Sequence, residues 1–279
     1  GVERVGDVVG SPEDGAGSNN WVVGGGRSAS ASPLVASDPH IAFGSVSCWY
    51  EVHLSGGGLN VTGAGYVGVP GVLFGRNERV AWGLTNNICS QRDLYQEKTD
   101  PERPGQFLYD GTWEQATEIT EVIAVKGGES VEKTVRLSRN GPIVDEILPS
   151  PTRDTGPVSL RWLGQDFSDE ISCLLAANSA GSCDEFREAL REWRVPTFSF
   201  GFADVQGHIG YQCVGRIPVR KGWERGYRPG WDPEHQWRGF VPFDGMPALA
   251  NPPEGWLRSA NNRTAPEDFP YPLSGTWSS

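Results

Sequence analysis

The stretch best suited to chemistry is Gly17-Ser18-Asn19-Asn20-Trp21-Val22-Val23, which places a serine at the head of a predicted strand. Trp21, Val22 and Val23 favour a strand, and the three glycines that follow end it. A serine hydroxyl is a weak nucleophile unless a base lies beside it. Cutting the bond before Ser18 would free its own α-amine, whose unperturbed pKa of about 7.7 to 8 suits a general base near neutral pH. One residue would then supply both the nucleophile and the base.

Gly17 suits a peptide bond that cuts itself, because the hydroxyl of Ser18 must reach the carbonyl of residue 17. A glycine there permits backbone angles that other residues resist. The four residues from Gly17 to Asn20 are also typical of a plain turn that leads into a strand. Taken alone, this stretch favours the turn, so the remainder of the chain has to decide between the two interpretations.

Composition places the chain among globular proteins. It has 279 residues, 37% hydrophobic and 21% charged, enough for one large core or two modest ones. The 37 glycines and 21 prolines predict many turns between short strands. A formal net charge of −11 argues against a nucleic-acid partner, because no basic patch is present to neutralise phosphates. No apolar run approaches a membrane span and no signal peptide is visible, so we expect no membrane partner.

The five cysteines give no sign of a metal centre. None shows the CxxC spacing of a zinc site. Cys173 and Cys183 lie ten residues apart around a predicted helix-to-helix turn. They fit a disulfide and a pair of unpaired structural thiols about equally well.

A polar leader precedes the first strand. Residues 1–17 are rich in Gly, Glu and Asp and predict a flexible leader or spacer before the processing site. Leu34 to Ala36 predict a short buried strand that a turn at Asp38-Pro39 ends, with His40 just beyond the turn. A lone histidine is more often structural than catalytic. We nevertheless expect this strand to pair with the one that begins at Ser18, which would bring His40 near the serine.

Most of the remaining pattern is β. Alternating apolar residues predict strands and hairpins over residues 49–66, 72–85, 93–95 and 198–211. The one helical zone covers residues 167–194, where a capping box at Ser182–Glu185 precedes an apolar stripe that we expect to pack into the core. Residues 220–257, rich in Trp, Pro and Gly, predict a long ordered loop.

Two asparagines could stabilise an oxyanion. Asn86 ends the predicted strand 80–85, where a backbone N–H without a ladder partner can donate to a substrate oxygen or to water. Asn261 also follows a strand, and its side-chain amide is a second donor. Adjacent asparagines such as Asn261-Asn262 are more often turn residues.

The chain resembles the β-chain of the penicillin acylase (penicillin amidase) family of N-terminal nucleophile hydrolases. Each matching segment is weak alone, but their order and spacing from Ser18 onward make the resemblance specific. The segments are Ser18-Asn19-Asn20-Trp21-Val22, Asp38-Pro39-His40, Gly68-Val69-Pro70-Gly71, Phe74-Gly75-Arg76-Asn77, Ala81-Trp82-Gly83-Leu84-Thr85-Asn86, Asp93-Leu94-Tyr95, Asn140-Gly141-Pro142-Ile143, Ala203-Asp204, Gly207-His208-Ile209-Gly210-Tyr211, Gly215-Arg216-Ile217-Pro218, Gly239-Phe240-Val241-Pro242-Phe243 and Ala260-Asn261-Asn262.

The resemblance implies an α+β protein with the four-layer αββα sandwich of N-terminal nucleophile hydrolases, strand-rich in this portion. Residues 18–279 would be the β-chain, incomplete at its C-terminus, and would pair with an α-chain cut from the same precursor. Ser18 would be the nucleophile with its own amine as base. The N–H of Asn86 and the side-chain amide of Asn261 would form the oxyanion hole, and His40 would orient the nucleophile. While residues 1–17 remain attached, that amine is tied up in an amide and the molecule is an inactive zymogen.

Family positions also imply a structural calcium, held by Asp93 and by the carbonyl of Pro218. Ser90 stands where relatives usually have a second acid, and one acid fewer attracts a hard cation more weakly. The resemblance implies no cofactor for catalysis.

The acyl pocket, by family position, would be lined by Ile41, Leu73, Phe74, Leu84 and Ile88. Aliphatic side chains outnumber aromatic ones in this set. We therefore predict an aliphatic or otherwise bulky apolar acyl group in preference to phenylacetyl.

Two functions from different classes follow. The first is an acylase of a linear amide, such as a β-lactam antibiotic side chain, an acyl-homoserine lactone or a lipopeptide, exported to the periplasm or secreted as its relatives are. The second is a Trp-rich β-sheet module that binds carbohydrate or peptide without catalysis. The second rests on the Trp-rich loop and gives no reason for the placing of Ser18, Asn86 and Asn261. A serine hydrolase of another kind is disfavoured, because the chain has no GxSxG or SxxK motif.

Overall fold

The computed structural model describes residues 17–40, 48–87, 89–148, 156–222, 226–273 and 275. Its largest element is a seven-stranded antiparallel sheet in the order β17-β15-β14-β6-β5-β4-β3. These strands are β3 (Trp49–Gly56), β4 (Leu59–Tyr66), β5 (Phe74–Arg76), β6 (Val80–Asn86), β14 (Phe198–Asp204), β15 (Ile209–Val214) and β17 (Ala248–Ala250). Both predicted hairpins are confirmed, since β5 pairs with β6 and β14 with β15.

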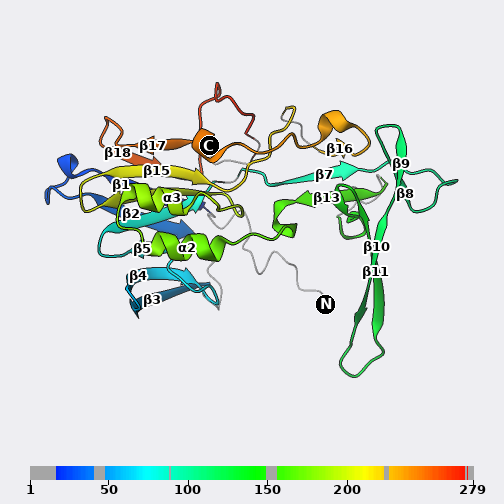
Figure 1. The fold of residues 1–279 in the computed structure, drawn as a ribbon, viewed down its shortest axis with the longest axis horizontal. Coiled ribbons are helices and arrows are strands. Elements are labelled where there is room, and N and C mark those ends of the chain that lie inside the picture. The colour runs from blue at the N-terminus through cyan, green and yellow to red at the C-terminus, as the bar shows by residue number, and fades with distance from the viewer. Residues whose placement is uncertain are drawn as a thin grey trace.

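A second, three-stranded sheet has the order β18-β1-β2 and packs over the middle of the first (Figure 1). It consists of β1 (Gly17–Val23), β2 (Leu34–His40) and β18 (Trp256–Ser259). β1 and β2 both contact β6. The side chain of Asn20 reaches across the interface and donates from Nδ2 to the carbonyl of Ser199 at 3.0 Å. The two sheets are thus joined by polar as well as apolar contacts at the strand that carries Ser18.

Two helices cover the opposite face of the large sheet. They are α2 (Glu170–Asn178) and α3 (Cys183–Ala189). The capping box is confirmed, because Ser182 Oγ accepts from the Glu185 N–H at 3.2 Å. The predicted apolar stripe is buried, and the ring of Phe186 packs against Trp82 and Phe202 with centroids 5.3 and 5.0 Å apart. The described residues therefore supply a helix–sheet–sheet stack, three of the four predicted layers.

The remaining strands lie beyond one end of the sandwich (Figure 1). A small sheet joins β13 (Val158–Trp162), β7 (Arg92–Gln96) and β16 (Arg228–Pro229). The other two sheets are the hairpin of β8 (Gln106–Tyr109) and β9 (Thr112–Gln115), and the projecting β10 (Thr117–Ile123), β11 (Val131–Ser138) and β12 (Gly141–Pro142). Short 3-10 helices occupy Gly25–Arg27, Asp145–Ile147, Leu163–Gln165, Pro233–His235 and Phe243–Gly245.

One sequence prediction near the serine was wrong. The predicted turn at Asp38-Pro39 is absent, because β2 continues through both residues to His40. β2 is an edge strand of its sheet. One side of an edge strand has no neighbouring strand, so a proline whose absent N–H would face that side breaks no ladder hydrogen bond. The longer strand aligns His40 with Gly17 and Pro39 with Ser18.

Three further expectations are refined. The Trp-rich loop over 220–257 contains β16, β17 and the start of β18. All five cysteines are free thiols, which excludes a Cys173–Cys183 disulfide in this structure. Residues 1–16 of the predicted leader lie outside the described residues, and Gly17, its last residue, is the first residue of β1.

Among the described helices, none combines the length and apolar character needed to cross a bilayer.

Candidate active site

Ser18 lies in the inner face of the three-stranded sheet. β1 alternates in exposure: Ser18, Asn20 and Val22 are buried, and Trp21 between them is exposed. This is the period-two pattern of a strand with one face against a core. Only 8% of Ser18 is accessible to solvent, and its neighbours on either side are β2 and β18. The predicted nucleophile therefore sits between two paired strands and above the large sheet.

The peptide bond before Ser18 is held from both sides. Ser18 Oγ donates to the Gly17 carbonyl oxygen at 2.7 Å. The backbone N–H of Ser18 donates to the side-chain oxygen of Asn261. The hydroxyl thus lies next to the carbonyl it would attack, and the leaving nitrogen has a fixed partner. Such positioning lowers the entropy cost of an intramolecular attack.

The side chain of Asn261 connects two of the other predicted site residues. Its Oδ1 accepts from Ser18 N, and its Nδ2 donates to the carbonyl of Asn86 at 2.7 Å. Its backbone has φ of 58°, in the left-handed region that asparagine tolerates better than most residues. The amide group has two N–H donors, so one remains for a substrate oxygen after the bond to Asn86 is counted.

The backbone N–H of Asn86 points toward the side of β6 on which Asn261 lies. A residue in an extended strand directs its N–H and C=O to the same side, and the carbonyl of Asn86 faces Asn261. The next N–H along the chain, that of Asn87, turns the other way and donates to Thr197 O at 3.2 Å. Ser18 and the two predicted oxyanion donors are therefore brought together by strands β1 and β6 and by the turn after β18.

The structure does not bring the His40 side chain to the hydroxyl of Ser18, because His40 is exposed on the opposite face of the β1–β2 pair from Ser18. His40 is the Cα partner of Gly17 across the β1–β2 pair. Its Nε2 lies 2.9 Å from Asp38 Oδ2, with the two side chains 40% and 59% exposed. Sequence reasoning missed Asp38 as the partner of His40, because it placed both residues around a turn. Residues two apart in a strand share a face, so recognising the longer β2 would have revealed the pair.

A polar layer between the sheets supports the site. Thr85 Oγ1 and Ser259 Oγ lie 2.7 Å apart and link β6 to β18. Thr85 stands just before Asn86, and Ser259 stands two residues before Asn261. Ser199 Oγ lies 2.8 Å from Tyr211 Oη in the strands behind them. Burial raises the pKa of Tyr211 well above its usual value, so its phenol stays protonated and is no candidate base. None of these residues was identified from the sequence, since serine and threonine are common in strands.

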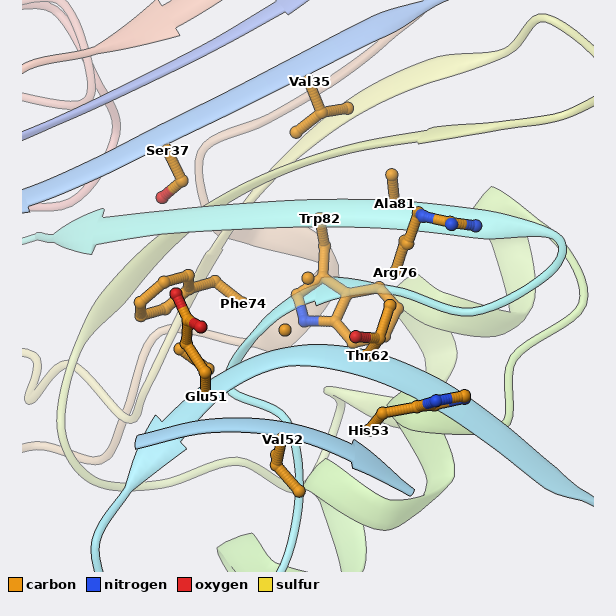
Figure 2. Close-up of a pocket in the computed structure, with 13 residues that line it drawn as sticks. Val35, Ser37, Glu51, Val52, His53, Thr62, Phe74, Arg76, Ala81 and Trp82 are labelled. Atoms are coloured by element: carbon orange, nitrogen blue, oxygen red, sulfur yellow. The ribbon is translucent and has the colours of Figure 1, made fainter. Parts of the chain in front are cut away.

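The predicted acyl-pocket residues separate in the structure. Leu73 and Leu84 are buried in the core between the large sheet and the helices. Phe74 lines a cavity of about 740 Å³ between β2 and the strands β3 to β6 (Figure 2). Ser37 lines the same cavity, two residues before the proline that pairs with Ser18. Ile41 and Ile88 lie outside the described residues.

The predicted calcium ligands are already engaged. Asp93 Oδ2 accepts from Arg220 Nε at 2.7 Å, and Asp93 Oδ1 lies 3.2 Å from Arg228 Nε. Within the described residues, no group of three or more His, Cys, Asp and Glu side chains could hold a metal ion. A carboxylate between two permanent cations does not fit a calcium ligand, because the guanidinium groups would repel a divalent ion.

Two indole rings of the Trp-rich loop, those of Trp237 and Trp256, are stacked against arginines of the protein itself. Arg161 and Arg220 lie over the ring of Trp237, with their Cζ atoms 4.4 and 5.7 Å from its centroid. Arg258 lies 5.5 Å over the ring of Trp256. These rings stack on the protein's own arginines, so the structure does not support the aromatic-platform basis of the binding-module hypothesis.

The structure leaves room for a side chain at Gly17, although the sequence suggested that a glycine is needed there. Gly17 has no positive φ, and a Cβ built on it would meet Asn261 Oδ1 at 3.4 Å and His40 Nδ1 at 3.9 Å, both ordinary contacts. We expect a full-length Gly17→Ala precursor to be cut at a rate within about threefold of wild type, since clash-free substitutions change free energies by about 0.5 kcal/mol. Intact mass against time measures this.

Gly83→Ala is a contrasting control for that experiment. A Cβ on Gly83 would lie 2.6 Å from Ser37 Cβ, so this variant is expected to lose roughly 1 to 3 kcal/mol of unfolding free energy. A folded Gly17→Ala protein that remains uncut would contradict the prediction and restore a role for glycine in the cleavage itself.

Comparison with known proteins first defines the class. A solved structure of a thermostable penicillin G acylase from Alcaligenes faecalis matches with a TM-score of 0.78 and 26% identity, covering 93% of this chain and 46% of that one. The described strands therefore have the fold of penicillin G acylase, an N-terminal nucleophile hydrolase. The penicillin amidase family model matches residues 2–279. The chain belongs to the penicillin amidase family.

Curated relatives agree with this assignment. The chain is 31% identical to the acyl-homoserine lactone acylase QuiP of Pseudomonas aeruginosa, over 94% of its own length and 32% of the relative's. It is 32% identical to the penicillin acylase 2 proenzyme of Pseudomonas sp. strain SE83, covering 92% of this chain and 33% of that protein. The penicillin G acylase of Escherichia coli is 29% identical over 91% of this chain and 29% of that protein. The chain spans about a third of the length of these relatives.

Proposed function

We propose that the full-length protein is an amidohydrolase that cleaves a linear amide between an apolar acyl group and an amine. The observation that carries the proposal is the placing of Ser18, whose Oγ donates to the Gly17 carbonyl at 2.7 Å while Asn261 holds its nitrogen. Membership of a family that contains named acylases supports the same chemistry.

Activation begins with cleavage of the Gly17–Ser18 bond. Ser18 Oγ attacks the Gly17 carbonyl carbon, the C–N bond breaks, and the hydroxyl proton passes to the leaving nitrogen. Breaking the C–N bond leaves Ser18 with a free α-amine and an ester on Oγ. Water then hydrolyses this ester, which restores the Ser18 hydroxyl and releases the leader with Gly17 as its C-terminal carboxylate. One relative, the penicillin acylase 2 proenzyme of Pseudomonas sp. strain SE83, is named as a precursor, which accords with such processing.

In the activated enzyme, Ser18 would act a second time. Its free amine, through a water molecule, takes the hydroxyl proton as Oγ attacks the carbonyl of a substrate amide. Two amide donors, the N–H of Asn86 and the side chain of Asn261, stabilise the oxyanion that forms. The amine product leaves, and water releases the acid from the acyl-enzyme.

The substrate class follows from an apolar acyl pocket. Its proposed members by family position are Ile41, Phe74 and Ile88, and Phe74 borders a cavity near β2. Leu73 and Leu84 are left out, because both are buried in the core between the large sheet and the helices. An aliphatic acyl chain, as in an acyl-homoserine lactone, a lipopeptide or the side chain of a β-lactam, suits such a lining. The relatives include acyl-homoserine lactone acylases and penicillin acylases, and this chain is about equally identical to both. Sequence identity therefore does not distinguish the two substrates, and the proposed acyl class is based on the residue types of the pocket.

A direct comparison of substrates tests this proposal. Initial rates of the full-length, processed protein are measured for octanoyl and phenylacetyl amides of one chromogenic amine, which keeps the leaving group constant. We expect the octanoyl amide to have the higher kcat/KM. A clear preference for phenylacetyl contradicts the acyl class, and no hydrolysis of either amide by processed protein contradicts the proposed function.

Two further parts of the proposal concern the assembly. We propose that an α-chain, cut from the same precursor, pairs with this chain as a heterodimer. The chain spans about a third of the length of its relatives, an extent that fits one chain of such a heterodimer. We also propose a periplasmic or secreted location. Fractionation of the native host followed by gel analysis of the processed protein tests both.

A further inference from the structure

Arg220 is buried at the junction of two loops. It follows β15 by six residues, and its side chain is 1% exposed. Its guanidinium contacts three oxygens: Asp93 Oδ2 at 2.7 Å, the carbonyl of Ser90 at 2.9 Å and the carbonyl of Pro218 at 3.4 Å. These oxygens belong to β7, to the segment just before it and to the segment after β15. One cation therefore joins two parts of the chain that are far apart in sequence.

The same three positions are those that the family resemblance associates with calcium. Asp93 and the carbonyl of Pro218 are the implied ligands, and Ser90 occupies the place of the second acid. In this chain all three turn an oxygen toward a single guanidinium. At position 90, where the family resemblance implies a carboxylate that binds calcium, the backbone carbonyl of Ser90 accepts a hydrogen bond from Arg220.

The surroundings of Asp93 leave its carboxylate no capacity for a metal. Besides Arg220, it accepts from Trp237 Nε1 at 2.6 Å and faces Arg228 Nε at 3.2 Å. Calcium takes about six to eight oxygen ligands at about 2.3 to 2.6 Å. An arginine stays protonated in proteins, so neither guanidinium can become neutral and make way for the ion.

We propose that the guanidinium of Arg220 is a built-in replacement for the structural calcium of this region, so that the protein holds these loops together without a metal. A planar group with several fixed donors suits the task, because it can satisfy one carboxylate and two carbonyls at once. The braced segment begins four residues after Asn86, so Arg220 also steadies the end of the strand that supplies the proposed oxyanion donor. This inference concerns a binding site outside the catalytic residues and is independent of the proposed substrate.

Chelation and calcium addition test the proposal on the full-length, processed protein. Bound calcium is measured by atomic emission after dialysis, and the melting temperature is measured with EDTA and with millimolar CaCl2. We expect substoichiometric calcium and the same Tm in both conditions. One calcium ion per molecule that EDTA removes, with a fall in Tm, would overturn the proposal.

A substitution provides the second arm. Arg220→Met keeps much of the length but removes the charge and donors, and we expect Tm to fall by roughly 10 °C, because a buried carboxylate and two carbonyls lose their partner. Arg220→Lys keeps the positive charge but loses the planar set of guanidinium donors, so we expect its Tm to fall by less than that of Arg220→Met. Arg238→Met, which removes an exposed arginine paired with Glu234 at 3.3 Å, is the matched control and should leave Tm unchanged.

The outcomes separate this inference from the acylase proposal. An Arg220→Met protein with the wild-type Tm would show that the guanidinium braces nothing and would overturn the inference. Should Arg220→Met fail to accumulate as folded protein, Arg220→Lys and the calcium content of the wild type still decide the matter. The substrate comparison uses wild-type protein only, so its result does not depend on Arg220.

Discussion

Ser18→Ala is expected to leave the full-length polypeptide uncut and to remove amide hydrolysis. The substitution deletes the hydroxyl that lies 2.7 Å from the Gly17 carbonyl oxygen, and no other hydroxyl of the described residues donates to that carbonyl. Loss of a serine nucleophile lowers kcat by roughly 10⁶-fold in a well-studied hydrolase. Intact mass spectrometry measures the cut, and release of a chromogenic amine measures the hydrolysis.

Ser30→Ala is a suitable control for this experiment. Ser30 is exposed in the loop after β1 and makes hydrogen bonds only within that loop. We expect this variant to be cut and to hydrolyse substrate as wild type does. Normal cleavage at Gly17–Ser18 in the Ser18→Ala protein would show that another group, or another protein, performs the processing.

Asn261→Gly is expected to lower kcat by roughly 10²- to 10³-fold, the loss that follows removal of one oxyanion donor. Glycine accepts the φ of 58° at this position, so the substitution removes the side-chain amide while leaving the backbone unstrained. Processing should slow as well, because the same side chain accepts from the N–H of Ser18. The kcat is therefore referred to the fraction of molecules already cut, counted by mass.

Asn261→Ala separates the loss of the amide from backbone strain. Alanine at a left-handed position costs roughly 1 to 2 kcal/mol, so its Tm should fall below that of Asn261→Gly while its kcat is lowered by a similar factor. The adjacent Asn262 makes hydrogen bonds only to its own turn, and Asn262→Ala should change kcat by less than about threefold. Wild-type kcat in the Asn261→Gly enzyme would exclude Asn261 from the oxyanion hole.

Local patterns predicted several elements well. The strand that begins at Ser18, the β5–β6 hairpin and the capping box at Ser182 all depend on residues near one another in sequence. A β-prone run, a turn between alternating segments and a hydroxyl three residues before a glutamate each act within a few residues. Such signals can be recognised without knowing where the rest of the chain lies.

The turn assigned to Asp38-Pro39 shows where local patterns fail. A proline usually interrupts a strand, but an edge strand keeps one side unpaired and accepts it. Whether a strand lies at an edge is decided by the arrangement of the whole sheet. The continuation of β2 is what sets His40 opposite Gly17 and brings Asp38 to its ring.

The sequence by itself determined the residue types of the candidate site, their order along the chain and the family to which they belong. Only the tertiary structure decided which atoms meet: Asn261 reaches the nitrogen of Ser18 across 243 residues, and Arg220 reaches Asp93 across 127. Local propensity cannot fix such contacts, because they form only when two sheets bury their shared face and each polar group enclosed there must find a partner. Burial made Asp93, a predicted calcium ligand, the partner of an arginine. The exposed pair of His40 and Asp38 depends instead on the continuation of β2, which places both side chains on one face of the strand.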